Sequence, residues 1–526
     1  MNQFLVEKIW IDGHMLTLGV CVRGKYQANV YQPRITVSFQ NGKQVRRMPL
    51  AVSSYGNEDG EYCIRAEYTF DLSYLYYRKP EGGSLSVWFS FTYGEEEHEP
   101  VLFEASEGIE AGAPQTASFE IEKDHMYFSL PKALFTRRRP KCHSFKDVVK
   151  NSANAVFAAV CRLFFVFPVK KNRVVFISNR RDDLTGNFQF VYEQLKKQPG
   201  LDIRFVLKHG ENKKTGFGTM FRYLFYCATS RIILVDDYIY LLYKMPRRKG
   251  TLLFQFWHAC GAFKTFGFSR LDLPGGQVQE SPAHRNYDYT IVSSHKIAKF
   301  YEEAFTMSPW QVLATGVPRT DIFFSDTYRE HARKQFYDRY PHLKERKILL
   351  FAPTFRGNGK HEGYYPGEQF DPVKAYEALD GEYVIIVKHH PYVKNRTDIA
   401  EKYKDVILDL SDEAELNDLL FVTDLLVTDY SSVIFEAALL DIPMILYAFD
   451  LEEYLDQRGF YYEYECLLPG KKVTGFGQLI QAVKEKDFEE ERRASFKERF
   501  FDQLDGKSSE RVAAFIMECI QRRTTK

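Results

Sequence analysis

The spacing of hydrophobic and polar residues changes along the chain and divides it into a β region and an α/β region. Over roughly the first 130 residues, apolar and polar positions alternate, as expected of strands with one face in a core. The alternating segments are Phe4–Val22, Arg34–Phe39, Tyr62–Leu72, Ser84–Tyr93 and Ala117–Leu130. We therefore predict a small antiparallel β-sandwich domain over residues 1–135. Its role is not readable from these residues, and docking or positioning of a partner is a hypothesis only.

A cationic cluster and a Phe-rich segment follow the β region. Arg137–Lys141 contains four basic residues, and Phe145–Pro168 has the apolar content of a short helix. A cationic run beside such a helix suits contact with an anionic membrane surface. An interdomain linker whose helix packs on the next domain fits the same residues equally well. We assign residues 136–170 to a linker helix and leave both interpretations open.

From Arg173 onward, short apolar strands alternate with helical segments in two successive sets. The first set comprises Arg173–Ser178, Asp202–Leu207, Arg231–Val235, Leu252–Phe256 and Tyr289–Val292. The second comprises Ile348–Ala352, Tyr383–Val387, Val406–Leu408, Leu425–Thr428 and Met444–Tyr447. Strands alternating with helices form βαβ units with parallel sheets. The sequence thus predicts two facing domains with a cleft between them, over residues 171–330 and 331–526, the second ending in charged helices.

Composition limits the classes of function. The chain of 526 residues carries 71 Lys and Arg against 70 Asp and Glu, so any anion site must be local and nucleic acid is not an expected partner. The 8 cysteines are scattered singly, which fits a reducing compartment and predicts no metal site. Residues 1–8 lack the features of a signal peptide, and no apolar run reaches the ~20 residues that span a bilayer. A cytoplasmic protein is expected.

The segment Asp429–Glu436 is the most informative stretch for function. It follows a short apolar strand and leads into an apolar helix, and ligands of parallel sheets bind at such strand ends. Ser431 and Ser432 lie where an N-cap belongs, so the free N–H groups of the first turn suit a phosphate. Glu436 lies on the same helix face as Ser432 and could contact sugar hydroxyls. The alternative is a plain Ser-capped helix with a solvated Glu.

A second polar cluster follows the predicted strand 252–256. His258, flanked by small residues, can point into the cleft as a general base near its ordinary pKa of ~6.5. Gly261 permits close approach of the backbone, and Lys264 could meet a phosphate. The alternative for His258 is a structural imidazole. Nothing marks Cys260 as an activated nucleophile, so we interpret it as a small buried residue.

Two arginines follow in similar positions. Arg319 lies on a loop fixed by Gly and Pro, from which a guanidinium can grip a phosphate with two hydrogen bonds. A surface Arg319 paired with Asp321 is the alternative. Thr354 and Arg356 offer a hydroxyl and a guanidinium directly after the strand 348–352.

The last cluster is Lys388-His389-His390 after the strand 383–387. Adjacent residues of extended backbone point in opposite directions, so we expect only one of the two imidazoles to face the cleft. The four clusters and the Ser-rich turn supply imidazoles, guanidinium groups, hydroxyls and a helix start, without a P-loop or a dinucleotide fingerprint. This combination fits phosphoryl or glycosyl transfer from a nucleotide-activated donor.

Five of these motifs together resemble a known family. They are Trp257–Gly267, Gly316–Arg319, Ala352–Arg356, Lys388–Pro391 and Thr428–Glu436. In order and spacing they are similar to the CDP-glycerol glycerophosphotransferase family, which contains the wall teichoic acid primases and polymerases of Gram-positive bacteria. The resemblance covers roughly residues 170–520.

The resemblance implies a GT-B fold, peripheral attachment to the cytoplasmic face of the plasma membrane, and CMP as the leaving group. The implied partners are CDP-ribitol or CDP-glycerol, a lipid-linked teichoic acid acceptor and the membrane surface, with no cofactor; a homo-oligomer is left open. His258 and His390 would correspond to the catalytic residues. The residues expected to bind substrate are Lys264, Arg319, Thr354, Arg356, Lys388, Asp429, Ser431, Ser432 and Glu436.

One departure bears on the polyol. Many glycerol-specific members have His-Gly-Thr-Pro at the first motif, where this chain has His258-Ala-Cys-Gly261 and resembles the ribitol-phosphate polymerases. We expect an acceptor hydroxyl to attack the β-phosphorus of a CDP-polyol, with His258 as base and His390, Arg319 and Arg356 stabilising charge. The alternatives are a GT-B sugar-nucleotide glycosyltransferase or epimerase, and a catalytically silent membrane scaffold.

Overall fold

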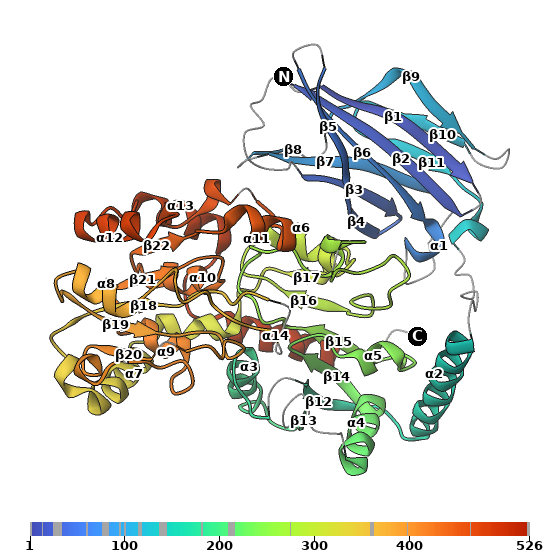
Figure 1. Cartoon of the computed structure of the whole chain (residues 1–526). Coiled ribbons are helices and arrows are strands. Elements are labelled where there is room, and N and C mark those ends of the chain that lie inside the picture. The colour runs from blue at the N-terminus through green and yellow to red at the C-terminus, as the bar shows by residue number, and fades with distance from the viewer. Residues whose placement is uncertain are drawn as a thin grey trace.

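The structure is a computed structural model of the chain. It describes residues 3–12, 14–24, 34–58, 61–75, 84–93, 96–98, 101–113, 118–135, 145–179, 182–208, 216–273, 275–357, 362–396, 398–462 and 464–522. Two β-sheets at the N-terminal end lie against two α/β units (Figure 1). The basic cluster Arg137–Lys141 lies outside the described residues.

The N-terminal region consists of two sheets that share one apolar core. The first has the order β5-β6-β2-β1-β9, and the second β10-β11-β7-β3-β4 with β8 paired to β7. Their strands are β1 Gln3–Asp12, β2 Met15–Gly24, β3 Arg34–Asn41, β4 Gln44–Leu50, β5 Val52–Glu58, β6 Glu61–Asp71, β7 Ser84–Tyr93, β8 Glu96–His98, β9 Glu104–Gly112, β10 Ser118–Ile121 and β11 Met126–Ser129, with the short helix α1 Leu72–Leu75. Leu18, Val37 and Phe89 are completely buried in the shared core, as the alternating pattern predicts.

Several details of this region differ from the prediction. The pairing is not purely antiparallel, because β1 runs parallel to β9. Within the predicted segment 117–130, the described residues form the hairpin β10–β11. Strands β4, β5, β8 and β9 lie outside the predicted segments because their sequences do not alternate. In β4 the reason is visible: Arg46 is only 6% exposed because a second part of the molecule covers the strand.

The first α/β unit is built on a six-stranded parallel sheet of order β13-β12-β14-β15-β16-β17. Its strands are β12 Lys170–Ser178, β13 Asp202–Leu207, β14 Ser230–Val235, β15 Leu252–Gln255, β16 Tyr289–Ile291 and β17 Val312–Leu313. Its helices are α3 Asn187–Leu195, α4 Phe217–Thr229, α5 Tyr240–Lys244 and α6 His295–Ala304, followed by the 3-10 helices η4 Pro309–Gln311 and η5 Pro318–Phe324. Helix α4 packs on one face of the sheet and α3 on the other.

The second α/β unit contains another six-stranded parallel sheet, of order β20-β19-β18-β21-β22-β23. Its strands are β18 Lys347–Phe351, β19 Tyr383–Val387, β20 Ile407–Asp409, β21 Leu425–Thr428, β22 Met444–Tyr447 and β23 Lys471–Val473. Its helices are α7 Asp326–Arg339, α8 Pro372–Ala378, α9 Leu416–Leu420, α10 Val433–Leu439, α11 Leu451–Arg458, α12 Phe476–Glu485 and α13 Glu491–Phe500. The predicted α/β fold with parallel sheets is confirmed, and one apolar cluster runs through both units.

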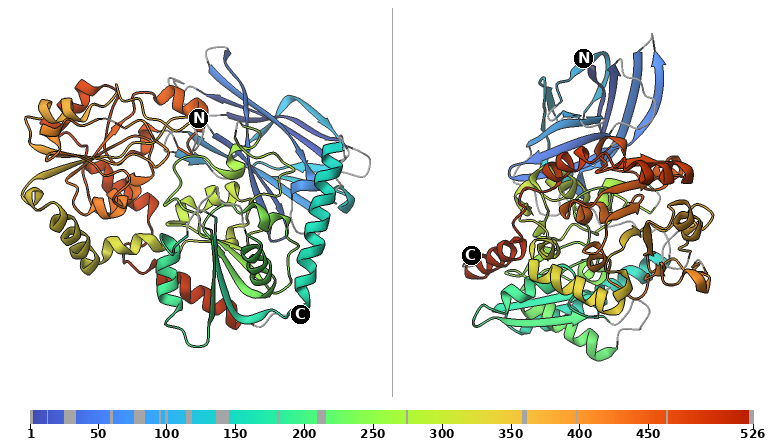
Figure 2. Two further views of the ribbon diagram at one scale, coloured as in Figure 1. Left: turned by 60° about the horizontal axis from the view of Figure 1, so that its bottom comes forward. Right: turned by 90° about the vertical axis from the view of Figure 1, so that its left-hand side faces the viewer.

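The last helix returns to the first sheet. Helix α14 (Ser508–Gln521) buries Val512 and Ile516 against the face that α3 also covers. Asp321, at the end of the first unit, accepts hydrogen bonds from the backbone N–H of Ser508 at 2.9 Å and of Ser509 at 2.8 Å. The chain therefore enters the second unit and comes back (Figure 2).

Helix α2 (Phe145–Leu163) and the 3-10 turn η2 (Phe164–Val166) lie at the edge of the first unit beside α5 (Figure 1). Cys161 is buried against this unit, whereas Leu163 and Val166 are 72% and 79% exposed. The segment thus packs with one side and presents apolar side chains with the other. Among the residues that the structure describes, no helix combines the length and the apolar character required to cross a bilayer.

The N-terminal sheets dock on α6 through buried polar contacts. Arg34 pairs with Glu303, and Nε of Arg47 lies 2.9 Å from Glu302. The Thr36 hydroxyl donates to Glu303 at 3.0 Å. Breaking such a buried ion pair typically costs ~3–5 kcal/mol, so these contacts favour the docked arrangement over one in which a single partner is left unpaired.

Candidate functional site

The Ser-rich turn joins strand β21 to helix α10. Ser432 is the backbone N-cap of α10, as predicted, but its side chain makes no capping hydrogen bond within the described structure. The hydroxyl of Ser431 instead accepts a long hydrogen bond, 3.4 Å, from the N–H of Val433. Both serines are half-buried, so their hydroxyls lie near the surface at the carboxyl end of the sheet.

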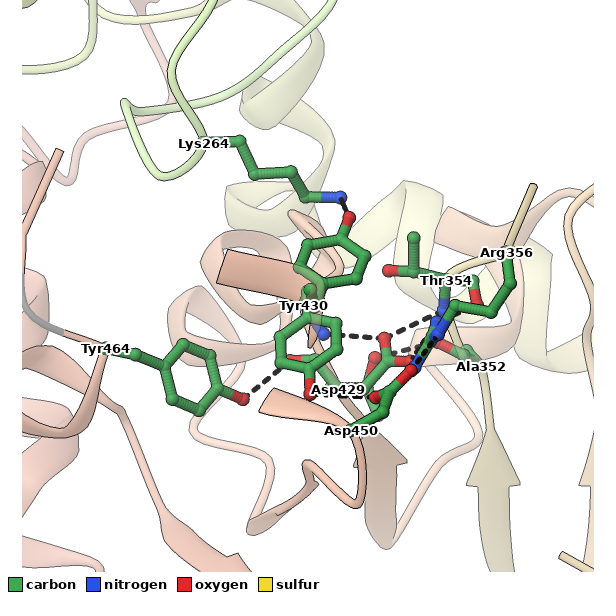
Figure 3. A network of polar contacts seen from close by, with 10 residues as sticks. Lys264, Ala352, Thr354, Arg356, Asp429, Tyr430, Asp450 and Tyr464 are labelled. Atoms are coloured by element: carbon green, nitrogen blue, oxygen red, sulfur yellow. Dashed lines mark hydrogen bonds and ion pairs between the residues drawn. The ribbon is translucent and has the colours of Figure 1, made fainter. Parts of the chain in front are cut away.

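Asp429 ties this turn to the loop after β18. Its Oδ1 accepts hydrogen bonds from the backbone N–H of Thr354 at 2.8 Å and of Tyr430 at 2.6 Å (Figure 3). Its Oδ2 lies 3.0 Å from a guanidinium nitrogen of Arg356. Asp429 is 1% exposed, so it does not face solvent, and it connects the two loops through buried contacts.

Arg356 is buried and bound by two carboxylates. Its Nε and Nη2 donate to Asp450 at 2.5 and 2.9 Å, and the third contact is the one to Asp429. Burial alone would lower the pKa of Arg356, but the two carboxylates outweigh burial and raise the pKa. The rings of Tyr365, Tyr430, Phe449 and Tyr454 surround the guanidinium carbon at 5.2–5.9 Å. The Arg356 guanidinium is therefore engaged by carboxylates and rings of the protein itself.

Asp450 is a site residue that the sequence reasoning missed. It follows β22, at the same carboxyl edge as the predicted clusters. Its position shortly after a buried strand could have marked it in the sequence as a candidate. Its Oδ1 also accepts the hydroxyl of Tyr430 at 2.9 Å. Tyr430 stacks on Tyr454 with ring centroids 3.9 Å apart, and Lys264 of the first unit donates to the Tyr454 hydroxyl at 2.8 Å. Lys264 thus joins the cluster from the opposite unit (Figure 3).

Arg319 and Glu436 form an ion pair between the two α/β units. Glu436 is 2% exposed; burial raises its pKa, and Arg319 acts in the opposite direction. Two alternatives from the sequence are therefore wrong. Glu436 is not solvated, and Arg319 does not pair with Asp321, because η5 turns Asp321 toward the start of α14 and Arg319 toward α10.

Cys260 and Gly261 lie at the same contact between the units. Cys260 is completely buried, and burial raises the pKa of its thiol, so its interpretation as a small buried residue is confirmed. Gly261 has φ +73°, and a Cβ at this position would lie 2.4 Å from the ring of Phe435. The predicted close approach is real, but the group approached is a side chain of the second unit.

His258 lies on a tightly fixed turn after β15. Its ring packs on Trp257 with centroids 4.5 Å apart, and its Nδ1 is 3.8 Å from Asp237. Trp257 has φ +50°, a conformation that is unusual for a bulky residue and is common at functional sites. Asn187 donates to the Trp257 carbonyl at 3.0 Å, and the Trp257 N–H donates to Gln255 at 2.8 Å. These bonds hold His258 with 43% of its side chain exposed.

The adjacent imidazoles after β19 have different surroundings, as extended backbone predicts. His389 is 5% exposed, whereas His390 is half-buried against Phe355, with ring centroids 4.7 Å apart. The N–H of Tyr392 donates to Nδ1 of His390 at 3.1 Å. A neutral His390 that accepts at Nδ1 carries its proton on Nε2, so this nitrogen is a hydrogen-bond donor. This tautomer suits stabilisation of negative charge.

Lys388 lies apart from the contacts described above. Its ammonium donates to the carbonyl of Ser411 at 2.5 Å, and burial lowers its pKa.

Of the predicted substrate-binding residues, the structure brings Lys264, Thr354, Arg356 and Asp429 into one cluster. It places Arg319 and Glu436 in a second cluster, linked to the first by the 429–436 segment.

Two buried histidines predict a specific response to acid. Burial lowers the pKa of both His284 and His389 to about 4. Because an unfolded histidine binds its proton near pH 6.5, their contribution to stability is present above about pH 6.5 and is lost as the pH falls toward 4. In an NMR titration we expect both rings to remain neutral at pH 5, whereas the urea-unfolded chain titrates near 6.5. Protonation of either ring between pH 6 and 7 in the folded protein would contradict this.

Two parallel sheets with polar clusters at their carboxyl edges define a two-unit α/β protein in which both units contribute side chains to the clusters. A model of the family described as CDP-Glycerol:Poly(glycerophosphate) glycerophosphotransferase matches residues 159–518. The chain belongs to this family, as the five motifs indicated.

Named relatives and solved structures agree with this assignment. The chain is 44% identical over 365 residues to a teichoic acid poly(ribitol-phosphate) polymerase of Bacillus spizizenii, a match that covers 69% of this chain and 59% of the relative. It is 40% identical over 387 residues to a teichoic acid ribitol-phosphate primase of the same organism, covering 70% and 97%. The chain thus spans about three fifths of the polymerase's length. The structure of the wall teichoic acid polymerase TagF shares the fold, with a TM-score of 0.57 and 22% identity over 72% of this chain and 97% of that one.

Proposed function

We propose that the protein transfers ribitol phosphate from CDP-ribitol to the terminal hydroxyl of a lipid-linked teichoic acid acceptor, with release of CMP. The observation that carries this proposal is the 40–44% identity to relatives that are both named for ribitol phosphate. Glycerol phosphate from CDP-glycerol is the alternative within the family, because the family model is described by glycerophosphate transfer.

In the proposed reaction, the acceptor hydroxyl attacks the β-phosphorus of the CDP-polyol. A new P–O bond forms to the acceptor, the bond from phosphorus to the CMP oxygen breaks, and the acceptor proton passes to His258. Asp237 lies 3.8 Å from His258 Nδ1, so it favours an orientation in which Nε2 faces the substrate. The Nε2–H of His390 would donate to the reacting phosphate.

The donor is proposed to bind at the carboxyl edge of the second sheet. Ser431 and Ser432 keep their hydroxyls near the surface there, with the N–H groups of the turn beside them. Arg356 and Asp429 contribute indirectly in this proposal, because their mutual contact fixes the Ser-rich turn relative to Thr354. Arg319 and Glu436 hold the two units together beneath the substrate.

The activity can be tested by the nucleotide released. With a lipid-linked acceptor, we expect CMP from CDP-ribitol at a rate at least tenfold above that from CDP-glycerol, and no nucleotide from UDP-sugars. If CMP is released faster from CDP-glycerol than from CDP-ribitol, the transferred group is glycerol phosphate and the protein keeps its place in the family. Release of UDP from a UDP-sugar, or of no nucleotide with any donor, would favour the glycosyltransferase or epimerase reading, or the silent scaffold.

The division into parts is also proposed. Residues 1–135 would form a β-sandwich domain, residues 136–170 a linker with α2, and the two α/β units a GT-B pair. We extend the first unit to include α14, because Val512 and Ile516 pack on its sheet. The protein would act at the cytoplasmic face of the membrane, where a lipid-linked acceptor is found.

The proposed membrane contact involves the exposed side of α2 and η2. Leu163, Val166 and Phe167 are 72%, 79% and 44% exposed there. Replacing all three with Ser should weaken binding to anionic vesicles, measured by sedimentation, since each buried CH₂ contributes about 0.8 kcal/mol.

Replacing the four basic residues within 137–141 with Gln should weaken vesicle binding further, by about 1 kcal/mol for each residue. Serine at Leu273, Val278 and Phe324, which are also exposed, is the matched control. Unchanged vesicle binding would favour the linker interpretation.

A further inference from the structure

A large cavity lies where the N-terminal sheets meet the first α/β unit, and none of its lining residues belongs to the two clusters described above. Its volume is about 730 Å³, within the range of ~300–1,000 Å³ typical of ligand sites. One wall is the turn between β3 and β4 with the start of β4, residues 43–46. The opposite wall is the segment 305–311, between α6 and β17, together with Arg247, Arg285 and Tyr287.

Both walls are fixed in place. The hydroxyl of Ser308 accepts from the N–H of Val45 at 3.1 Å and from Arg46 at 3.0 Å, which joins the two walls directly. The docking contacts of Arg34 and Arg47 with helix α6 lie close by. Figure 1 shows β4 lying over this part of the first unit. The cavity is therefore preformed, and the N-terminal sheets complete it.

The charge of the lining favours an anion. Four of the fourteen lining residues are cationic, namely Lys43, Arg46, Arg247 and Arg285, and none of these fourteen described residues is acidic. Asp288 pairs with Arg247 and offsets the charge of that one lining cation. Glu302 and Glu303 pair with Arg47 and Arg34 outside the lining, so the lining keeps an excess of positive charge. A guanidinium held in a fixed orientation is well suited to phosphate.

The orientation of Arg285 is fixed by its surroundings. Its guanidinium donates to the carbonyls of Ser281 at 3.0 Å, of Gln279 at 2.8 Å and of Tyr74, and it lies 4.5 Å from the ring centroid of Phe268. Aromatic surface completes the cavity. Trp310, in η4, lines the cavity and is 51% exposed, whereas Phe305, also in the lining, is completely buried. Apolar surface of this kind contacts the carbon backbone of a ligand while the cations contact its charges.

We propose that this cavity binds internal repeats of a polyol phosphate chain, and this inference rests on the proposed function. Such a chain combines phosphate charges with carbon backbone, and the lining combines cationic with apolar side chains. The cavity is also close to the first motif. Phe305 packs on Trp257 with centroids 5.3 Å apart, and Trp257 packs on His258. A chain held in the cavity is thereby kept near the residue proposed to activate its end, and the N-terminal sheets gain a role in acceptor binding.

The test uses side chains that can be changed without disturbing the walls. Lys43 is exposed and Trp310 is half-exposed, so Lys43→Gln with Trp310→Ala removes one charge and one aromatic face. The matched control is Lys123→Gln with Trp10→Ala, an exposed pair in the N-terminal sheets away from the cavity lining. Binding of a soluble, lipid-free ribitol phosphate oligomer to the full chain is measured by isothermal titration calorimetry at two salt concentrations.

We expect the parent and the control to bind the oligomer alike, more weakly at high salt, and the cavity variant to bind at least tenfold more weakly. Equal affinity of the cavity variant and the parent, or no binding by the parent, overturns the inference. So does full competition by equimolar inorganic phosphate, which would indicate a simple anion site, or by CDP-ribitol, which would indicate a nucleotide site. The release of CMP by the parent is measured separately, so failure of the proposed activity is distinguishable from failure of this binding site.

Discussion

Replacing His258 with alanine is expected to lower the rate of CMP release by about 10²–10⁴-fold, the usual contribution of a general base. The fold should be retained, because the side chain is 43% exposed and its ring packs on the surface of Trp257. The measurement is single-turnover release of CMP from CDP-ribitol with a saturating acceptor, together with the affinity for CDP-ribitol, which should change little.

The matched control for this variant is His331→Ala on helix α7, where the histidine is exposed and lies outside both clusters. Its rate should equal that of the parent. A His258→Ala protein that turns over at a rate near that of the parent would remove His258 from the mechanism. An equal loss in both variants would point to a general effect on the protein.

The second large effect is expected for Arg356→Ala. This change leaves the buried Asp429 and the partly buried Asp450 without the cation that both contact, and breaking a buried ion pair typically costs ~3–5 kcal/mol. The urea midpoint of unfolding, followed by circular dichroism, should therefore fall markedly. Arg356→Lys should recover only part of the loss, because an ammonium lacks the planar fork that reaches both carboxylates.

Lys334→Ala provides the comparison for the stability of Arg356→Ala. Lys334 forms an exposed pair with Asp338 on α7, and exposed pairs contribute about 0–1 kcal/mol. If Arg356→Ala lowers the midpoint no more than Lys334→Ala does, the buried cluster does not hold the second unit together. In that case Arg356 would be free for the direct role at the phosphate that the sequence suggested.

The α/β part of the fold was predictable because its strands are buried on both faces. Segments such as 348–352 and 383–387 read as continuous apolar runs, and the structure places strands β18 and β19 there. The N-terminal strands were harder to predict where a neighbouring part covers them. In β4, Arg46 and Arg47 interrupt the apolar pattern because they contact Ser308 and Glu302 of the first α/β unit. A local pattern cannot reveal a partner that lies about 260 residues away.

The sequence indicated where the polar clusters of the candidate site lie along the chain, but it did not indicate which charged residues pair with each other. Every predicted cluster follows a strand, since the carboxyl edge of a parallel sheet collects polar groups. The choice of partner depends on distance in space. Arg319 has Asp321 two residues away in sequence, yet it pairs with Glu436, 117 residues away. Arg356 likewise meets Asp450 across 94 residues, and no spacing rule within one sequence shows such a contact.

The return of α14 to the first sheet sets an order on folding during synthesis. One face of that sheet, including Val174 and Ile232, is covered by α3 together with α14. Because the ribosome releases the chain from its N-terminal end, this face stays partly uncovered until residues 508–521 have emerged. By then the strands of the second sheet, which ends with β23 at Val473, have already been released. Of the two parallel sheets, the one synthesised first is therefore the last to be fully covered, and a ribosome that stops before Ser508 releases a chain with an exposed apolar face.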